Sequence, residues 1–402
     1  MLTHITPEQA IDLVLAQPAA PKTERISLSD ALDRILAEDV TARITLPSFD
    51  KSPFDGYACR TADLPGTLRV AGCLTAGTDH LPALAPGEAL RIFTGAPVPP
   101  SADVVIKQED AAAFDGCVVV SVSPAPGTNV ISAGEDCKAG ELLIPAGTRL
   151  LPAHLGELAG QGISVLTVFC LPKAVLIPTG SELAEPGEPC SPFGIYNSSS
   201  YVLGAYLRRM GFSVSRSANI PDEPEAVRKA VDQAMASDAD VVFTTGGASI
   251  GDYDFAARTA QAIGAEPLFW KVRMKPGGAL LVSRLGSKLL VSLSGNPAAA
   301  LMSLLVVLRP WLMALTGSED RACFVSLPLK EDMPKTASSL RLLRGHLDFT
   351  GGVVSFAEHE GRGNGNIASF ARCEVIGLIP GGSGPLKKGD VIRALRLPPE
   401  LC

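Results

Sequence analysis

The chain has 402 residues, of which 46% are hydrophobic and 19% charged, with a formal net charge of −7 at pH 7. This length exceeds what one hydrophobic core fills, so about two to four domains are expected. The composition excludes a wholly disordered chain, and the acidic balance argues against a broad nucleic-acid-binding surface. An anionic ligand would have to be held by glycine-rich loops, helix N-termini or single lysines.

Cysteine usage and the terminal segments bear on the cell compartment. The nine cysteines include no C-x-x-C pair and have no histidine cluster beside them. A zinc site or disulfide framework is therefore not expected, and reduced thiols in the cytoplasm fit best. The N-terminus lacks the pattern of a signal peptide. The most apolar segment, 298–308, is too short to span a membrane and indicates a buried helix.

The first part of the chain predicts a small β module inserted into another domain. Thr6 is placed to cap a helix that starts at Pro7, with Gln9 completing a capping box. Residues 29–37 and 152–159 are further predicted helices. Between them lie short apolar runs separated by Gly and Pro turns, which predict strands. The predicted strands are 68–71, 89–94, 103–107 and 117–122.

From Lys173 the pattern changes to alternating strands and helices, which predicts a doubly wound α/β unit of about 145 residues. Predicted strands are 174–177, 212–215, 241–243, 279–282 and 288–292, and predicted helices are 198–210, 223–236 and one from Pro297. Residues after 319 predict a compact β domain. The expected division is therefore 1–45 with 133–170, 46–132, 171–318 and 319–402.

The segment Asp240–Asp254 is the strongest single candidate for a binding site. Its apolar run Val241–Phe243 predicts a buried strand, and Thr245-Gly246-Gly247 follows directly. Adjacent glycines allow positive φ and close approach of a ligand at the carboxyl end of a strand. Backbone N–H groups in such a loop can bind phosphate. Taken alone, the same glycines are also compatible with an ordinary tight turn.

Several loops together resemble the molybdopterin molybdenumtransferase family, which includes the MoeA proteins and the E domain of gephyrin. Phe49–Ala58 (FDKSPFDGYA) is similar to the family segment FDNSAMDGYA, and Thr94–Pro99 (TGAPVP) matches another. The resemblance runs in family order from about residue 5 to 395. The remaining matching segments are 102–103, 108–109, 134–136, 178–183, 245–251, 274–277 and 295–297.

The resemblance implies both a fold and a reaction. The fold is a multidomain α/β plus β chain: a MogA-like doubly wound domain, an inserted β domain, an elongated helical/β domain and a C-terminal β domain. The expected protein is a cytoplasmic homodimer with its ligand cleft at the subunit interface. The implied reaction is Mg²⁺-assisted hydrolysis of adenylyl-molybdopterin, coupled to insertion of molybdate into the molybdopterin dithiolene. Transient contacts with the molybdopterin adenylyltransferase and acceptor molybdoenzymes are expected, but none with nucleic acid or membrane.

The resemblance also assigns site residues, and their types suit the reaction, because hydrolysis of a phosphoanhydride uses carboxylates, a divalent cation and backbone amides. The expected catalytic residues are Asp55, Asp136, Glu182 and Asp254, of which Asp55, Glu182 and Asp254 would hold the metal. The expected substrate-binding residues are Thr94, Thr245, Gly246, Gly247, Ser249, Asp222, Lys275, Gly295, Asn296 and Pro297.

Each of these residue types also has a plainer interpretation. An acidic residue in a loop is commonly a turn former or a helix cap, and Asp222 follows Pro221 ahead of a predicted helix. Thr94 is equally compatible with a residue that only enters a turn, and Lys275 with a surface lysine. The full signature around Asp55 favours a functional role for that residue.

Departures from the family pattern leave a second function open. The family's KPGKP appears here as Lys275–Ala279 (KPGGA), its PGNPVS as Ser294–Ala299 (SGNPAA), and His346 stands where an arginine is expected. These changes remove groups that bind oxyanions. The alternative is therefore a non-catalytic paralogue that carries or senses molybdopterin or its cofactor. The sequence does not distinguish molybdate from tungstate.

Overall fold

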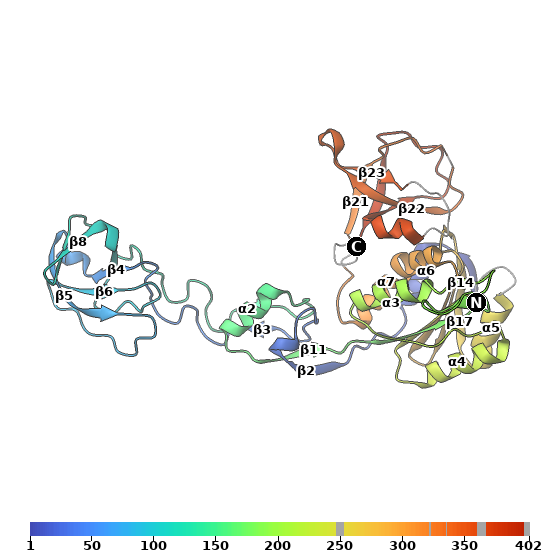
Figure 1. Ribbon diagram of the computed structural model, residues 1–402, viewed down its shortest axis with the longest axis horizontal. Helices are drawn as coiled ribbons and strands as arrows, with labels where there is room; N and C mark the ends of the chain where they lie inside the picture. Colours follow the sequence, from blue (N-terminus) through green and yellow to red (C-terminus); the bar gives the residue numbers. More distant parts are fainter. Residues whose placement is uncertain (247–252, 321–322, 335, 360–366, 398–402) are drawn as a thin grey trace.

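The structure is a computed structural model that describes residues 1–246, 253–320, 323–334, 336–359 and 367–397. Figure 1 shows an elongated molecule. A β-rich distal domain lies at one end and is joined through a small middle domain to an α/β domain, beside which the C-terminal β domain lies. The chain runs out to the distal domain and back, so the distal domain interrupts the middle domain in sequence.

The distal domain is built on a six-stranded sheet of order β7-β4-β6-β5-β9-β8. The strands predicted at 68–71, 89–94, 103–107 and 117–122 are confirmed as β5, β6, β7 and β9, whereas β4 and β8 were not predicted. Buried apolar side chains fill both sides of the sheet. Its elements are β4 (Gly56–Cys59), η2 (Thr61–Asp63), β5 (Gly66–Leu74), β6 (Glu88–Ile92), β7 (Val104–Lys107), η3 (Gln108–Asp110), β8 (Ala111–Phe114) and β9 (Cys117–Val120).

The middle domain consists of short paired strands and one helix. Its elements are β2 (Thr23–Ser27), η1 (Leu28–Asp30), β3 (Val40–Thr41), β10 (Leu142–Ile144), α2 (Pro152–Gly160) and β11 (Val165–Phe169). The helix predicted at 29–37 is wrong, since only the single 3₁₀ turn η1 forms there. Asp33 has φ 63°, which a right-handed helix does not accommodate. Ile35 and Leu36 instead bridge to Arg149 and Val168.

The α/β domain contains a seven-stranded sheet of order β1-β17-β19-β20-β16-β12-β15. Neighbours among β15, β12, β16 and β20 are parallel, and helices cover both faces, which confirms the doubly wound prediction. Its elements are β1 (Leu2–Ile5), α1 (Pro7–Leu15), β12 (Lys173–Pro178), β13 (Leu183–Ala184), β14 (Ile195–Tyr196), α3 (Ser199–Arg209), β15 (Ser213–Arg216), α4 (Pro224–Ala236), β16 (Val241–Thr245), α5 (Tyr253–Ala262), β17 (Glu266–Val272), β19 (Leu280–Leu285), β20 (Lys288–Leu293), α6 (Pro297–Ser303), the π-helical η4 (Leu304–Leu308) and α7 (Arg309–Leu315).

The first strand and helix belong to this α/β domain, which corrects the expected placement of residues 1–45 in the elongated domain. β1 pairs in parallel with the edge strand β17, and Ile5, Ala10 and Val14 are buried in the α/β core. Helix α1 begins as predicted: Gln9 N donates to Thr6 Oγ1 at 3.2 Å, and Thr6 N donates to Gln9 Oε1 at 3.0 Å. A helix of this length needs a partner for its apolar face, and α7 and η4 provide one.

One apolar helical stretch lies in the core of the α/β domain. Of the residues that the structure describes, only Pro297–Leu315 has the length and composition of a membrane span, and 72% of its most apolar window is buried inside the protein. Its first turn carries Asn296 and Pro297, so this core element also positions part of the site below.

The C-terminal domain is a six-stranded sheet of order β18-β22-β24-β25-β21, with β23 added beside β22. β18 comes from the α/β part of the chain and pairs in parallel with β22, which joins the two domains. Its elements are β18 (Met274–Lys275), β21 (Cys323–Pro328), β22 (Leu340–Asp348), η5 (Thr350–Gly352), β23 (Ser355–Glu358), η6 (Ile367–Arg372), β24 (Val375–Ile379) and β25 (Val391–Arg396).

Candidate active site

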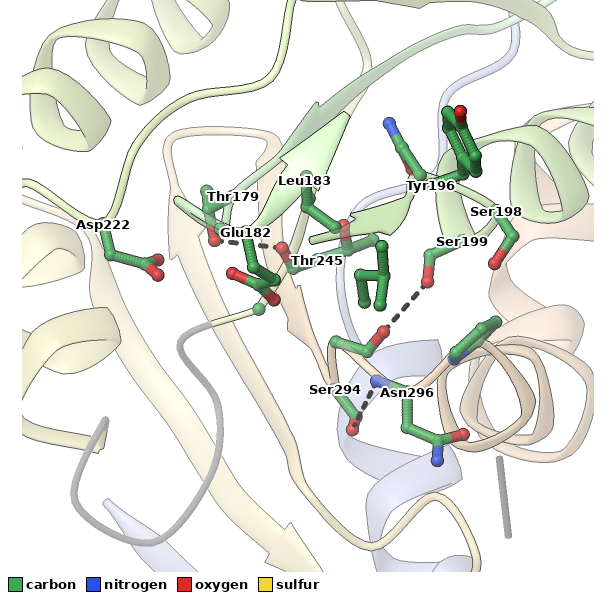
Figure 2. A pocket seen from close by; sticks show the side chains of 16 residues that line it. Thr179, Glu182, Leu183, Tyr196, Ser198, Ser199, Asp222, Thr245, Ser294 and Asn296 are labelled. Carbon is green, nitrogen blue, oxygen red and sulfur yellow. Dashed lines mark hydrogen bonds between the residues drawn. The ribbon is translucent and has the colours of Figure 1, made fainter. Parts of the chain in front are cut away.

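A cleft of about 670 Å³ opens at the carboxyl ends of β12, β16 and β20 (Figure 2). This is the edge at which open α/β sheets bind ligands. The N-terminal ends of α3 and α6 border it, so the positive ends of two helix dipoles face the same space. The described residues that line it are Thr179, Gly180, Glu182, Leu183, Ile195, Tyr196, Asn197, Ser198, Ser199, Asp222, Thr245, Gly246, Ser294, Gly295, Asn296 and Pro297.

Gly246 is held tightly against the end of β12. Its φ is 101°, and a Cβ there would lie 2.5 Å from Thr179 Oγ1 and 2.6 Å from Thr179 O. The Thr179 hydroxyl and backbone N–H both donate to Thr245 O at 2.9 Å, which fixes this contact. The backbone therefore requires glycine at 246, as the sequence indicates.

The turn before α6 forms the opposite wall. Asn296 Oδ1 accepts hydrogen bonds from Ala298 N at 3.0 Å and Ala299 N at 3.1 Å, so Asn296 caps the helix as predicted. The Ser199 hydroxyl donates to Gly295 O at 3.0 Å and ties the start of α3 to this turn. Figure 2 shows this bond across the cleft from Glu182 and Asp222.

Replacing the cap tests how much it stabilises the turn. Asn296→Ala is expected to lower the free energy of unfolding by about 1–2 kcal/mol, because two backbone N–H groups lose their acceptor. Asn296→Asp keeps the acceptor and should stay within about 0.5 kcal/mol of the wild type. Urea unfolding followed by tryptophan fluorescence measures both. Equal stability of the two variants would show that the cap contributes nothing.

The charged groups in the cleft are all acidic. Glu182 and Asp222 line it, and the described lining residues include no Lys, Arg or His. Asp222 is anchored by reciprocal bonds: Ser181 N donates to Asp222 Oδ2 at 3.3 Å, and Asp222 N donates to Ser181 Oγ at 3.0 Å. Figure 2 shows both carboxylates at the end of the cleft nearest Thr179. An anionic ligand would need a cation to enter such a site.

The carboxylate pair fits Mg²⁺ carried in with a phosphate ligand. Mg²⁺ commonly takes one or two protein carboxylates and completes its shell with water and phosphate oxygens. In the described parts of the chain, no three His, Cys, Asp or Glu side chains form a complete metal cage. Glu182 and Asp222 are therefore the described groups of the cleft that could hold such an ion, whereas the sequence prediction names Asp55, Glu182 and Asp254.

Asp55 and Thr94 form a separate unit on the distal domain. Thr94 N and Thr94 Oγ1 each donate to Asp55 Oδ1 at 2.8 Å. These two hydrogen bonds lower the pKa of Asp55, and the charge of Arg91 adds to the effect. The carboxylate form is therefore favoured at neutral pH, and this preference is lost only as the pH falls through the lowered pKa.

Within one chain the predicted residues do not all meet. The distal domain that carries Asp55 and Thr94 lies at the opposite end of the molecule from the cleft (Figure 1). Asp136 is exposed on the segment that returns from the distal domain. The structure brings together a different subset in the cleft: Glu182, Asp222, Thr245, Gly246, Gly295, Asn296 and Pro297.

Other predicted residues lie beside the cleft or outside the description. Lys275 is exposed on β18 and is not among the cleft residues, although the Ser303 hydroxyl on α6 donates to Gly277 O at 2.7 Å and holds its loop against that helix. Gly247 and Ser249 lie outside the described residues. Asp254 falls in the first turn of α5, and its side chain is likewise outside the description.

The sequence analysis missed the wall formed by residues 195–199. Asn197 is buried there: its Oδ1 accepts from Ser200 N at 3.2 Å and from Ser200 Oγ at 2.9 Å, while its Nδ2 donates to Asn219 Oδ1 at 2.9 Å. The Asn-Ser run directly before a predicted helix is the signal that could have found it, because such residues mark helix starts.

Fold and cleft together define an α/β domain with a ligand-binding site at the carboxyl ends of its parallel strands. Residues 175–314 match the family described as "Probable molybdopterin binding domain", and residues 5–162 match "MoeA N-terminal region (domain I and II)". The chain is 31% identical to the molybdopterin molybdenumtransferase of Bacillus subtilis, over 99% of this chain and 95% of that protein. It therefore belongs to the molybdopterin molybdenumtransferase family, whose members act in molybdenum cofactor biosynthesis.

Two further comparisons agree with this family. The molybdopterin molybdenumtransferase of Staphylococcus epidermidis is 30% identical over 97% of this chain and 95% of its own length. A crystal structure of the MoeA protein of Pyrococcus horikoshii superposes with a TM-score of 0.84 at 27% identity and covers 98% of both chains. The match extends across the distal, middle, α/β and C-terminal domains, so the fold class expected from the sequence is confirmed over the whole chain.

Proposed function

We propose that this enzyme catalyses Mg²⁺-assisted hydrolysis of adenylyl-molybdopterin and couples it to insertion of molybdate into the molybdopterin dithiolene. The observation that carries the proposal is a cleft that combines the Gly246 turn, two helix N-termini and a carboxylate pair without a basic side chain among its described lining residues. This combination suits a phosphoanhydride that enters with a divalent cation.

The chain's own groups have distinct tasks in the hydrolysis. A water oxygen bonds to one phosphorus of the anhydride, the bridging P–O bond breaks, and AMP and molybdopterin are formed with release of a proton. Glu182 and Asp222 would hold the cation and orient the attacking water. The positive ends of the α3 and α6 dipoles would attract the phosphate oxygens. Bound Mg²⁺ would supply charge neutralisation at those oxygens.

The remaining predicted residues belong to the proposal as well. Gly247, Ser249 and Asp254 follow Gly246 along the chain and would extend the phosphate and metal site. Lys275 would hold the oxyanion, since its loop is fixed to α6 through Gly277. Asp136, Asp55 and Thr94 would act from the other subunit of a cytoplasmic homodimer. Transient contacts with the adenylyltransferase and with acceptor molybdoenzymes would deliver the substrate and receive the product.

The distribution of charge and exposure supports a site shared between two subunits. The distal edge around Asp55 exposes three aromatic side chains, Phe49, Phe54 and Phe93, with exposed fractions of 46%, 39% and 37%. Such a grouping of exposed aromatic residues beside charged groups is typical of a surface that another protein covers. In a twofold dimer, the distal edge of each subunit would close the cleft of the other.

A single-turnover assay tests the proposal. Adenylyl-molybdopterin with molybdate and Mg²⁺ should give stoichiometric AMP, and a chelator such as EDTA should stop the release until Mg²⁺ is added back. Tight binding of adenylyl-molybdopterin without AMP release would instead support the carrier alternative. That alternative is not favoured, because the curated relatives are named as transferases.

A further inference from the structure

The distal edge carries a lysine, Lys107, that forms no ion pair with the residues that the structure describes. Lys107 ends β7 opposite Gly56 of β4, and the next residue, Gln108, donates its backbone N–H to Asp55 O at 3.0 Å. The Lys107 ammonium lies 4.2 Å from the centre of the Phe54 ring. With the residues that the structure describes it forms no hydrogen bond and no ion pair. Its three N–H donors are therefore available on the edge that carries Asp55.

The neighbouring cation, Arg91, is in a different situation. Its Nη2 donates to Gln108 Oε1 at 2.6 Å, and Nη1 donates to Gly56 O at 3.5 Å. Its guanidinium lies over Tyr57 and Phe93, at 5.0 and 5.1 Å from the ring centres. Arg91 is thus used to hold the edge together. Lys107 is held in place by one aromatic ring and keeps its hydrogen-bonding capacity.

Glu109 does not neutralise Lys107 by direct contact. Gln108 Nε2 donates to Glu109 Oε1 at 3.1 Å. This hydrogen bond is the main cause of the lowered pKa of Glu109, and the charge of Lys107 is a smaller cause. The charge of Lys107 therefore acts on the Glu109 carboxylate from a distance, and the two groups form no ion pair. An anionic group that approached the edge would meet the free ammonium first.

The cleft described above lacks this type of group. Its described lining offers Glu182 and Asp222 but no cation. A bound Mg²⁺ offsets part of the charge of a phosphoanhydride, and a lysine usually complements it at the phosphate oxygens. Lys107 and Asp55 belong to the same distal edge through the pairing of β4 with β7, so an arrangement that brings this edge to the substrate brings both residues toward it.

We propose that Lys107 is a substrate-binding residue that donates to the phosphate oxygens of the nucleotide ligand, across the dimer interface. This inference rests on the proposed function and adds to it a cation that recognises phosphate. Phe54 positions this cation, since the ring face attracts the ammonium and holds it on the distal edge. The ligand class is a phosphoanhydride or a phosphomonoester such as AMP.

Calorimetric binding of AMP with Mg²⁺ to the full-length protein tests the proposal, together with KM and kcat for AMP release. Lys107→Met keeps the apolar stem and removes the charge. It is expected to raise the Kd for AMP and the KM about tenfold and to weaken their dependence on salt, since one charge-assisted hydrogen bond is lost. Lys107→Arg should stay within about threefold of the wild type. Lys229→Met, on the exposed side of α4, removes the same charge elsewhere and should change nothing.

The outcomes separate the two proposals. Wild-type AMP release combined with an unchanged Kd and KM in Lys107→Met overturns the role of Lys107 alone. An equal weakening by Lys229→Met also overturns it, because the effect would then reflect net charge. If the wild type binds AMP but releases no AMP from adenylyl-molybdopterin, the proposed hydrolysis is wrong. The Kd values of the Lys107 variants for AMP still test whether Lys107 binds phosphate. Absence of any AMP binding by the wild type overturns the contact between Lys107 and AMP, whereas the hydrolysis is judged by AMP release alone.

Discussion

Mixed dimers of Asp55→Asn and Glu182→Gln are expected to recover about a quarter of wild-type AMP release, although each variant alone is inactive. If the distal edge of one subunit closes the cleft of the other, a mixed dimer contains one site with both changes and one intact site. Random pairing of equal amounts makes about half of the dimers mixed, and each of these has one intact site of two. Co-expression with two different affinity tags, followed by single-turnover assay, measures the recovery.

A matched control uses two changes on the same surface. Asp55→Asn mixed with Thr94→Val places a damaged distal edge against every cleft, so no site is intact and activity should not recover. Thr94→Val removes one of the two donors to Asp55, because the backbone N–H remains. Recovery in neither mixture would show that Asp55 and Glu182 do not act across the interface. Within one chain the distal domain lies far from the cleft (Figure 1). This experiment therefore decides whether the distal edge of one subunit reaches the cleft of the other.

Local sequence rules predicted the parts of the fold that depend on neighbouring residues. Thr6 and Asn296 both cap helices where the sequence places them, because a cap needs only residues within one turn. The glycine at 246 was also predictable, since a strand followed by Gly-Gly calls for positive φ. The failures involve distant partners. β1 is four residues long and mostly exposed, and only its pairing with β17 makes it a strand.

The same distinction applies to the candidate site. Glu182, Asp222 and Gly246 lie in the loops that follow the neighbouring parallel strands β12, β15 and β16. The α/β pattern alone therefore brings them to one edge of the sheet. The position of Asp55 relative to the cleft depends on how a long arm is placed and, in the proposed dimer, on a second copy of the chain, neither of which is encoded in local periodicity. The sequence analysis did not predict Asn197, because its role depends on burial and on hydrogen bonds to Ser200 and Asn219, which the sequence does not show.

Gly246→Ala is expected to cause the largest loss of stability among single changes in the cleft, about 3 kcal/mol in the α/β domain. The alanine would have to adopt a φ near 101° and place its Cβ 2.5 Å from the Thr179 hydroxyl. Relief requires Thr179 to move, which breaks its two hydrogen bonds to Thr245 O and separates the ends of β12 and β16. AMP binding should be lost with it.

Gly295→Ala is the matched control, because it lies on the other wall of the same cleft and has no positive φ. A Cβ at 295 would approach Gly246 Cα only to 3.6 Å, an ordinary contact, so stability should change by less than about 1 kcal/mol. The chain has two tryptophans, and both Trp270 and Trp311 lie in the α/β domain, so their fluorescence during urea unfolding reports on this domain. Equal stability of Gly246→Ala and Gly295→Ala would mean that the loop relaxes without moving Thr179. The close approach of the 246 backbone to β12 would then not be what shapes this wall of the cleft.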